Sequence, residues 1–327
     1  MTEKLHLSFA IGDYDHTRDI INGKVPVEGI ELIAGNHQIE EIFFRFTFFK
    51  EWDVSELSMG KYCSLRSQGD TTFTAIPVFI SRQFRHSMIY VREGSEITQP
   101  GQLKGKRIGV PEWAQTATIY SRGYLTHTAG VPLDSVQWVQ AGVNMAGRVE
   151  KVQLKLPANV SIERHADRTL SDMLLRGEID AVLSARQPDA YGKGAVRLFE
   201  DYQPAEEAWY RDTGIYPIMH VAAIRTEVLD RHPWIARNLF QAFEEAKRRS
   251  YDRLSDIAAS GAPVAWLSDI MRRQRALFGD DPFPYGLEKN YKTLDAFLQF
   301  GFEQGVCHTR IKPEDLFPKS LQASFKV

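Results

Sequence analysis

Strands and helices alternate in two segments of the chain, and this alternation restricts the fold more than any other feature. The first segment spans 103–131, where RIGV is a short apolar strand and ATIYSRGYL an amphipathic helix that stops at Gly130. The second spans 166–185, where a helix stops at Gly177 and the apolar run IDAVLSA follows. Strands that alternate with helices build parallel sheets covered by helices. The sequence therefore predicts an α/β fold.

The rest of the chain extends this pattern and then becomes helical. Apolar or alternating runs predict further strands at 4–12, 29–35, 72–79, 86–93, 136–141 and near the start of 213–229. Helical spacing of apolar residues predicts helices at 40–53, 232–254, 265–277 and 288–304. The stretch 187–213 shows neither period and is predicted to be irregular.

Length and charge limit the classes of partner. A chain of 327 residues is long enough for two domains. Its net charge of −2 gives no basic field for nucleic acid or an anionic membrane, and no apolar run approaches the roughly 20 residues of a membrane span. The first residues lack the pattern of a secretory signal, and Cys63 and Cys307 lie far apart. These features favour a cytoplasmic protein with reduced thiols.

Polar residues follow several of the predicted strands. Ligands of open α/β sheets bind beyond the carboxyl ends of the strands, so these residues are expected to converge on one cleft. The predicted substrate-binding residues are Tyr14, Ser58, Ser81, Arg82, Arg85, Thr116 and Arg186.

The stretch SRQFR at 81–85 contains the strongest anion-binding signal. Arg82 and Arg85 are spaced so that one helical turn or a loop could point both guanidinium groups the same way. A guanidinium binds a carboxylate through two hydrogen bonds, so the pair suits a substrate with adjacent carboxylates. The alternative is that one or both arginines form surface salt bridges. The helix start after Pro111 offers a second anion site, because free N–H groups and the helix dipole favour negative charge there.

The residues of 103–111 and 174–183 resemble those of type 2 periplasmic-binding-protein folds. The resemblance implies a two-lobed fold with a ligand cleft between the lobes. It implies a discontinuous lobe I of 1–87 plus 220–327 and a lobe II of 88–219. Two crossover strands, at 86–92 and 214–222, would connect the lobes.

A closer resemblance covers six segments in order along the chain. They are GDYDHT (12–17), EGIEL (28–32), SELSMGKY (55–62), AIPVFISRQFRHSMIYV (75–91), IGVPEWAQTA (108–117) and TGIYPIMHVAAIR (213–225). Together they resemble the 4,5-dihydroxyphthalate decarboxylase family. The resemblance implies a cytoplasmic carboxy-lyase that converts 4,5-dihydroxyphthalate to protocatechuate and CO2 without an organic cofactor. One departure is His16, which stands where an arginine is expected in many relatives.

Aromatic decarboxylation needs an acid that delivers a proton to the ring carbon that loses its carboxylate. The predicted catalytic residues are His86, His16 and Glu112, with structural roles as the alternative for each. His220 is interpreted as a structural residue on the second crossover. Catechols chelate divalent ions, so a metal-dependent decarboxylase stays an alternative, but no short HxH, HxxxH or CxxC spacing occurs and no metal ligand is assigned.

Two further functions fit the same fold. One is a solute-binding protein for a small carboxylate, and the other is a pyrimidine-precursor synthase. In each case the expected partner is a small molecule, whereas nucleic acid and membranes are not expected. For the leading hypothesis this molecule is an aromatic carboxylate. The sequence leaves open whether the chain forms a homo-oligomer.

Overall fold

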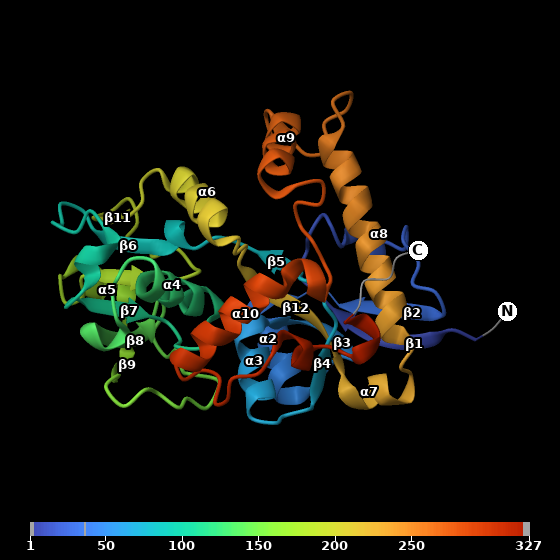
Figure 1. Cartoon of the computed structure of the whole chain (residues 1–327), viewed down its shortest axis with the longest axis horizontal. Coiled ribbons are helices and arrows are strands. Elements are labelled where there is room, and N and C mark those ends of the chain that lie inside the picture. The colour runs from blue at the N-terminus through green and yellow to red at the C-terminus, as the bar shows by residue number, and fades with distance from the viewer. Residues whose placement is uncertain (1–2, 36, 323–327) are drawn as a thin grey trace.

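The computed structural model describes residues 3–35 and 37–322, which form two mixed β-sheets with helices packed around them (Figure 1). The strands are β1 (Leu5–Ala10), β2 (Ile30–Gly35), β3 (Val54–Ser58), β4 (Phe73–Ala75), β5 (Ser81–Arg82), β6 (Ile89–Arg92), β7 (Arg107–Val110), β8 (Gln137–Gly142), β9 (Ile162–Thr169), β10 (Ala181–Leu183), β11 (Ala195–Arg197) and β12 (Ile218–Arg225). The helices are α1 (Arg18–Ile21), α2 (Ile39–Phe49), α3 (Met59–Ser67), α4 (Thr116–His127), α5 (Leu170–Leu175), α6 (Tyr202–Thr213), α7 (Thr226–Arg231), α8 (Ile235–Ser255), α9 (Leu267–Phe278) and α10 (Leu287–Glu303).

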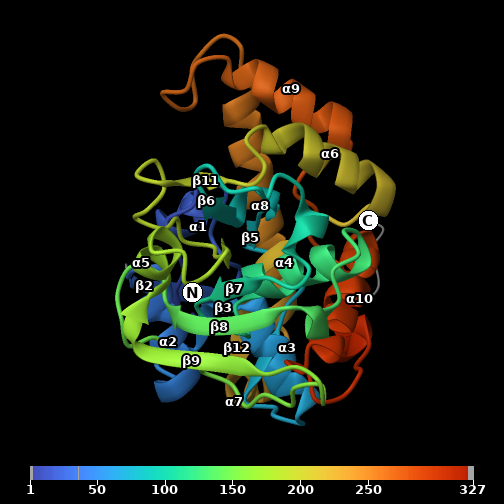
Figure 2. The same cartoon turned by 90° about the vertical axis from the view of Figure 1, so that its left-hand side faces the viewer.

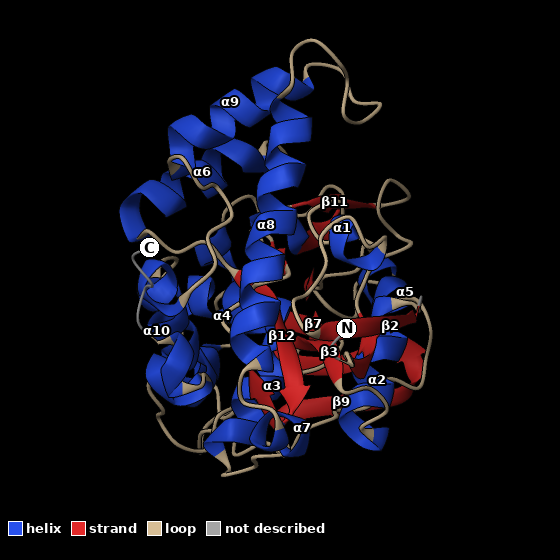
Figure 3. Cartoon of the chain, turned by 90° about the vertical axis from the view of Figure 1, so that its right-hand side faces the viewer, coloured by secondary structure: helices blue, strands red, loops and turns tan. Residues whose placement is uncertain are grey.

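The first sheet has the order β2-β1-β3-β12-β4, and β5 also pairs with β12. Strands β2, β1 and β3 are parallel, whereas β12 runs antiparallel to its neighbours. All five residues of β3 are buried, because this strand lies inside the sheet and is covered by α2 and α3. Figure 3 shows α8 and α10 beside this sheet, and Figure 1 shows α8 and α9 projecting from the body.

The second sheet has the order β11-β6-β10-β7-β8-β9. Its centre is parallel, and β6 is antiparallel to β10 and β11. Figure 2 turns this sheet toward the viewer, with β8 and β9 in front. The predicted α/β class is therefore observed, with strands of both directions in each sheet.

The chain passes between the sheets twice. It leaves the first sheet after β5, forms a 3₁₀ turn at His86–Met88 and enters β6. It returns after α6 into β12, which begins at Ile218. The first sheet thus takes its strands from 5–82 and 218–225, and the second takes its strands from 89–197. The predicted lobe boundaries, 1–87 plus 220–327 and 88–219, stay a prediction.

Three sequence predictions of secondary structure were wrong. Residues 86–88, predicted as the start of a strand, form a 3₁₀ turn before β6. The stretch 187–213 contains β11 and α6, and Trp209 of α6 is buried against His86 and Phe84. Residues 166–169 belong to strand β9 rather than to a helix. Strand β9 has no fully buried residue and α6 buries only Glu206 and Trp209, so the apolar periodicity that reveals an element is weak in them.

Cys63 and Cys307 are buried free thiols. Among the helices of the described residues, none combines the length and apolar character that crossing a membrane requires.

Candidate active site

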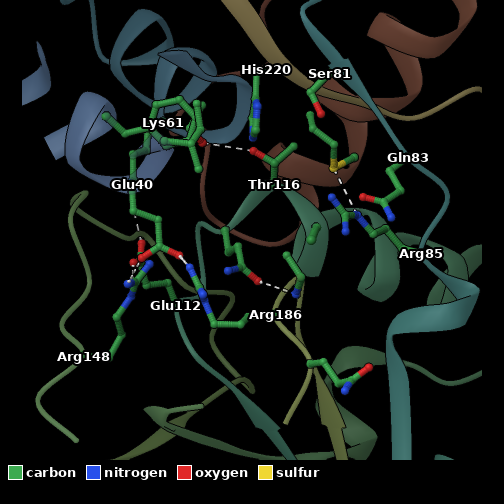
Figure 4. Close-up of a pocket in the computed structure, with 18 residues that line it drawn as sticks. Glu40, Lys61, Ser81, Gln83, Arg85, Glu112, Thr116, Arg148, Arg186 and His220 are labelled. Carbon is green, nitrogen blue, oxygen red and sulfur yellow. Dashed lines mark hydrogen bonds and ion pairs between the residues drawn. The ribbon is translucent and has the colours of Figure 1, made fainter. Parts of the chain in front are cut away.

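A cavity of about 450 Å³ lies where the carboxyl ends of strands from both sheets meet. Ser58 ends β3, Thr116 begins the helix after β7, and residues 185–187 follow β10. The residues that line the cavity are Ile39, Glu40, Phe43, Ser58, Lys61, Ser81, Gln83, Arg85, Glu112, Gln115, Thr116, Ala117, Arg148, Ala185, Arg186, Gln187, Met219 and His220 (Figure 4). Its volume is within the range of small-molecule sites.

The starts of α3 and α4 meet at one wall of the cavity. The hydroxyl oxygens of Ser58 and Thr116 are 3.1 Å apart, and the N–H of Gly60 donates to Thr116 Oγ1 at 3.0 Å. These bonds connect the first sheet's α3 to the second sheet's α4. They also position both hydroxyls at the cavity.

Gly60 is predicted to be essential to this contact. A Cβ atom at position 60 would lie 2.6 Å from the carbonyl oxygen of Ala114, a backbone atom that cannot rotate away. We expect Gly60→Ala to separate α3 from the 112–115 segment and to destabilise the fold by about 1–3 kcal/mol, the usual cost of overpacking. Differential scanning calorimetry measures the loss. A melting temperature equal to that of the wild type would contradict the observed approach of the two segments.

The segment 81–85 presents alternate residues to the cavity. Ser81, Gln83 and Arg85 line it, whereas Arg82 does not. Strand β5 covers only Ser81 and Arg82, whose side chains point to opposite sides of the extended backbone, and the chain beyond it leaves the extended conformation by Arg85. Of the two arginines predicted to clamp the substrate, the structure brings Arg85 alone to the cavity.

Arg82 instead forms buried hydrogen bonds outside the cavity. It is buried and donates to the carbonyl oxygens of Tyr216 at 2.9 Å and Pro284 at 2.8 Å. It also bonds to the side-chain oxygen of Asn290. Its guanidinium packs over three aromatic rings, those of Phe79, Tyr216 and Phe283. Arg82 is not among the residues that line the cavity.

Arg85 lines the cavity with a guanidinium group that is available to bind a ligand. Arg85 Nε donates a hydrogen bond to Met219 Sδ at 3.1 Å. Arg85 forms no ion pair with any residue that the structure describes. Burial lowers the pKa of Arg85 to about 10, so the group stays charged at neutral pH. A buried cation without a paired carboxylate favours an anionic ligand.

The opposite wall holds an ion-pair network (Figure 4). Glu40 of α2 contacts Arg148 at 3.0 Å and Arg186 at 2.7 Å, so it joins the first sheet's helix to loops of the second. Burial alone would raise the pKa of Glu40, but hydrogen bonds from the two arginines outweigh it and lower the pKa to about 2. Arg186 therefore reaches the cavity with its charge already paired.

Glu112 is the most enclosed charge of this wall, with 1% of its surface exposed. Its carboxylate lies 2.5 Å from Arg148 Nε, 3.3 Å from Lys151 Nζ and 3.7 Å from Lys61 Nζ. Protonating it would disrupt three ion pairs at once, so it suits the role of a counter-charge better than the predicted role of a proton donor.

Three further predicted residues lie outside the cavity. His16 Nε2 donates a hydrogen bond to the carbonyl oxygen of Ile80 at 2.9 Å, and burial lowers the pKa of His16. His86 packs among Tyr124, Phe199 and Trp209, its ring nitrogens have no hydrogen-bond partner among the described residues, and burial lowers its pKa to about 4. Both histidines are therefore neutral at pH 7 and do not face the cavity.

The third of these residues is Tyr14, whose hydroxyl donates to Glu56 Oε1 at 2.8 Å behind the cavity wall. Burial and the Glu56 carboxylate raise the pKa of Tyr14, which keeps its proton in place as a donor. Of the predicted site residues, the structure brings six to the cavity: Ser58, Ser81, Arg85, Glu112, Thr116 and Arg186.

Sequence reasoning missed several residues of the cavity, namely Glu40, Lys61, Gln83 and Arg148, and it interpreted His220 as structural. Lys61 gave a usable signal, because it lies in the first turn of a helix that follows a strand. Arg148 gave none, since it belongs to a loop without periodicity.

No group of three or more His, Cys, Asp or Glu side chains in the described ranges is arranged to hold a metal ion. The expectation of a reaction without a cofactor stays a prediction.

Comparison with curated proteins decides the family. The chain is 39% identical over 328 residues to a 4,5-dihydroxyphthalate decarboxylase of Comamonas testosteroni, covering 99% of each chain. The chain belongs to the 4,5-dihydroxyphthalate decarboxylase family. A family member of Pseudomonas putida is 41% identical over 212 residues, which cover 64% of this chain and 82% of that protein. No protein-family model matches the chain.

The fold of this family member is that of periplasmic binding proteins. The structure resembles the aliphatic sulphonate binding protein of Escherichia coli with a TM-score of 0.52 and 10% identity, over 98% of this chain and 99% of that one. A putative sulfonate-binding protein of Methylobacillus flagellatus gives a TM-score of 0.52 at 14% identity, over 97% and 92% of the two chains. The predicted fold class is confirmed.

Proposed function

We propose that the chain is a carboxy-lyase that removes one carboxylate from 4,5-dihydroxyphthalate and releases protocatechuate and CO2. The observation that carries the proposal is the 39% identity to a decarboxylase of that name over 99% of both chains. The cavity is consistent with it, because four cationic side chains (Lys61, Arg85, Arg148 and Arg186) face two carboxylates there. An excess of positive charge favours a dianionic substrate.

The two ends of the cavity match the two ends of this substrate. One side presents Arg85, which has no ion-pair partner among the described residues, together with Ser81 and Gln83, and all three carry hydrogen-bond donors suited to a carboxylate (Figure 4). The other side presents the carboxylates Glu40 and Glu112, whose oxygens are acceptors suited to ring hydroxyls. The substrate has its carboxylates and its hydroxyls at opposite ends of the ring, so it fits in one orientation.

The proposed chemistry has a simple electron balance. A proton adds to the ring carbon that bears the leaving carboxylate, while the para hydroxyl, as its phenolate, donates an electron pair into the ring. The carbon–carboxylate bond then breaks, its electron pair restores the aromatic ring and CO2 leaves. The protein must hold the carboxylate out of the ring plane and supply the proton.

A direct assay tests the proposal. The purified chain is incubated with 4,5-dihydroxyphthalate, and the release of CO2 and protocatechuate is measured. We expect both products in equal amounts. Binding of the substrate without either product would overturn the proposal in favour of a solute-binding protein. Turnover that is lost on chelation of divalent metal and regained on its addition would support the metal-dependent alternative.

Lys61 is expected to make ligand binding depend on pH. Burial lowers the pKa of Lys61 to about 8, although the Glu112 carboxylate opposes this shift. The ammonium is charged below pH 8 and neutral above it, so the affinity for a dianion should fall as the pH rises through this value. We expect phthalate, which has no titrating hydroxyl, to bind about tenfold more weakly at pH 9.5 than at pH 7, as one cavity charge is lost.

Isothermal titration calorimetry measures this effect. The control is Lys61→Met, which should bind phthalate weakly at both pH values and show no step near pH 8. A wild-type affinity that does not change between these pH values would contradict the role of Lys61.

The proposal places the enzyme in the cytoplasm, in phthalate degradation as a part of aromatic catabolism. Two buried free cysteines support a reducing compartment, and the net charge of −2 supports a small-molecule substrate over nucleic acid.

A further inference from the structure

A buried carboxylate behind the cavity holds one of the lining histidines. Glu56 on β3 has 0% of its surface exposed and accepts three hydrogen bonds. The donors are the N–H of Gly12 at 2.9 Å, the Tyr14 hydroxyl at 2.8 Å and His220 Nδ1 at 2.6 Å. Burying an ionised carboxylate costs several kcal/mol unless it is well paired. The three hydrogen bonds therefore offset the cost of burying Glu56 and fix the position of its carboxylate.

Strand pairing sets the geometry of this pair. On the antiparallel strands β3 and β12, His220 lies opposite Ser58 and Ala222 lies opposite Glu56. Residues 56 and 58 share one face of β3, so the side chain of His220 projects from the same face of the sheet. The rings of Phe43 and His220 pack edge to face with their centroids 4.8 Å apart, which restricts the rotation of the imidazole.

The hydrogen bond to Glu56 determines which nitrogen faces the cavity. An ionised carboxylate only accepts, so Nδ1 of His220 carries the proton that it donates to Glu56. Nε2 has no hydrogen-bond partner within the described part of the chain, and His220 lines the cavity. Nε2 is therefore the atom that can exchange a proton with a ligand.

Other candidates for the acid are less suitable. His16 and His86 lack a carboxylate at hydrogen-bond distance and lie outside the cavity, and His86 is 4.0 Å from Glu206. Glu112 is held by three cations. His220 alone combines, among the described histidines, a lining position with a hydrogen bond to a buried carboxylate.

We infer that His220 is the general acid that protonates the ring carbon, and that Glu56 is the positioning residue that orients it; this rests on the proposed function. The proton moves from Nε2 to the carbon that bears the leaving carboxylate. The imidazolium becomes a neutral imidazole as the ring becomes a dienone. Loss of CO2 restores the aromatic ring, and solvent returns a proton to Nε2 for the next cycle.

Reversal of the proton step allows a test that does not require decarboxylation. The same acid should exchange the hydrogen that replaces the carboxylate, which in protocatechuate is the ring hydrogen at C6, with deuterium from D2O. Proton NMR of protocatechuate incubated with the wild-type enzyme should show loss of this signal alone. His220→Gln should lose both the exchange and kcat by about 10²–10⁴-fold, the usual contribution of a positioned acid, while KM changes little.

Matched variants separate chemistry from folding. His127→Gln is the control, because His127 Nε2 forms an equally short 2.6 Å contact with Glu303 away from the cavity. It should retain wild-type kcat. His220→Ala should regain part of its exchange activity when imidazole is added, which a misfolded protein would not do. Glu56→Gln should lower kcat with little effect on the affinity for phthalate.

The outcomes distinguish the inference from the proposed function. If His220→Gln retains wild-type kcat and exchange, the inference is overturned while the decarboxylase stands. If the wild type shows neither turnover nor exchange, both are overturned. Loss of exchange in His220→Gln, with phthalate affinity intact and rescue of His220→Ala by imidazole, supports the inference.

Discussion

Replacing Arg85 by methionine is expected to raise the KM for 4,5-dihydroxyphthalate by about 10²–10³-fold. Loss of one partner from a buried, hydrogen-bonded charge pair costs about 2–5 kcal/mol, and each 1.4 kcal/mol is about tenfold in affinity. Arg85 is the right position because its guanidinium lines the cavity and forms no ion pair among the described residues. Steady-state kinetics measures the change.

Arg82→Met is the matched control for this experiment. Arg82 lies three positions earlier but bonds to Tyr216, Pro284 and Asn290 behind the cavity. Its removal leaves buried acceptors without a donor, which lowers stability. We therefore expect a lower melting temperature and little change in KM. An equal rise in KM for both variants would restore the two-arginine clamp that the sequence predicts.

The second large effect is expected on stability. Glu112→Gln removes the carboxylate that compensates Arg148, Lys151 and Lys61, and the carboxylate is almost fully buried. Breaking a buried pair by removing one partner costs about 3–5 kcal/mol, because the remaining charges stay buried without compensation. For a chain of this size the melting temperature should fall by roughly 4–7 °C.

Glu40→Gln is the control for Glu112. Glu40 also contacts two arginines, but 43% of its side-chain surface is exposed, so solvent screens the pairs. We expect a loss below about 1 kcal/mol. Thermal unfolding of both variants checks the difference. A Glu112→Gln protein with unchanged melting temperature and no activity would instead support the catalytic role that the sequence predicts for this residue.

The path of the chain near the site was predictable to the extent that it depends on local pattern. Gly130 and Gly177 indicate where two helices end, and the apolar runs beside them indicate strands. The rule that ligands bind beyond strand ends correctly predicted that Ser58, Thr116 and Arg186 lie at the cavity. Elements at the periphery, such as α6 and β9, were missed because they bury too little apolar surface to show a period.

The direction of individual side chains was not predictable in this way. His220 and Glu56 are 164 residues apart and meet only because β12 pairs with β3. Arg82 and Arg85 have the same chemistry in the sequence, but Arg82 lies on β5 and bonds to Tyr216, Pro284 and Asn290, whereas Arg85 follows the strand and lines the cavity. Histidines also look alike in a sequence, although burial makes His16 and His86 neutral.

The sequence by itself determined the α/β class, the family resemblance and the set of chain segments that end at the cavity, because apolar period and glycine stops act locally. Tertiary structure alone decided which charges are already paired and which are available. Arg186 and Glu112 are held in ion pairs, whereas Arg85 and Nε2 of His220 are left for a ligand. Pairing depends on distances between residues that are remote in the chain, and local pattern does not contain them.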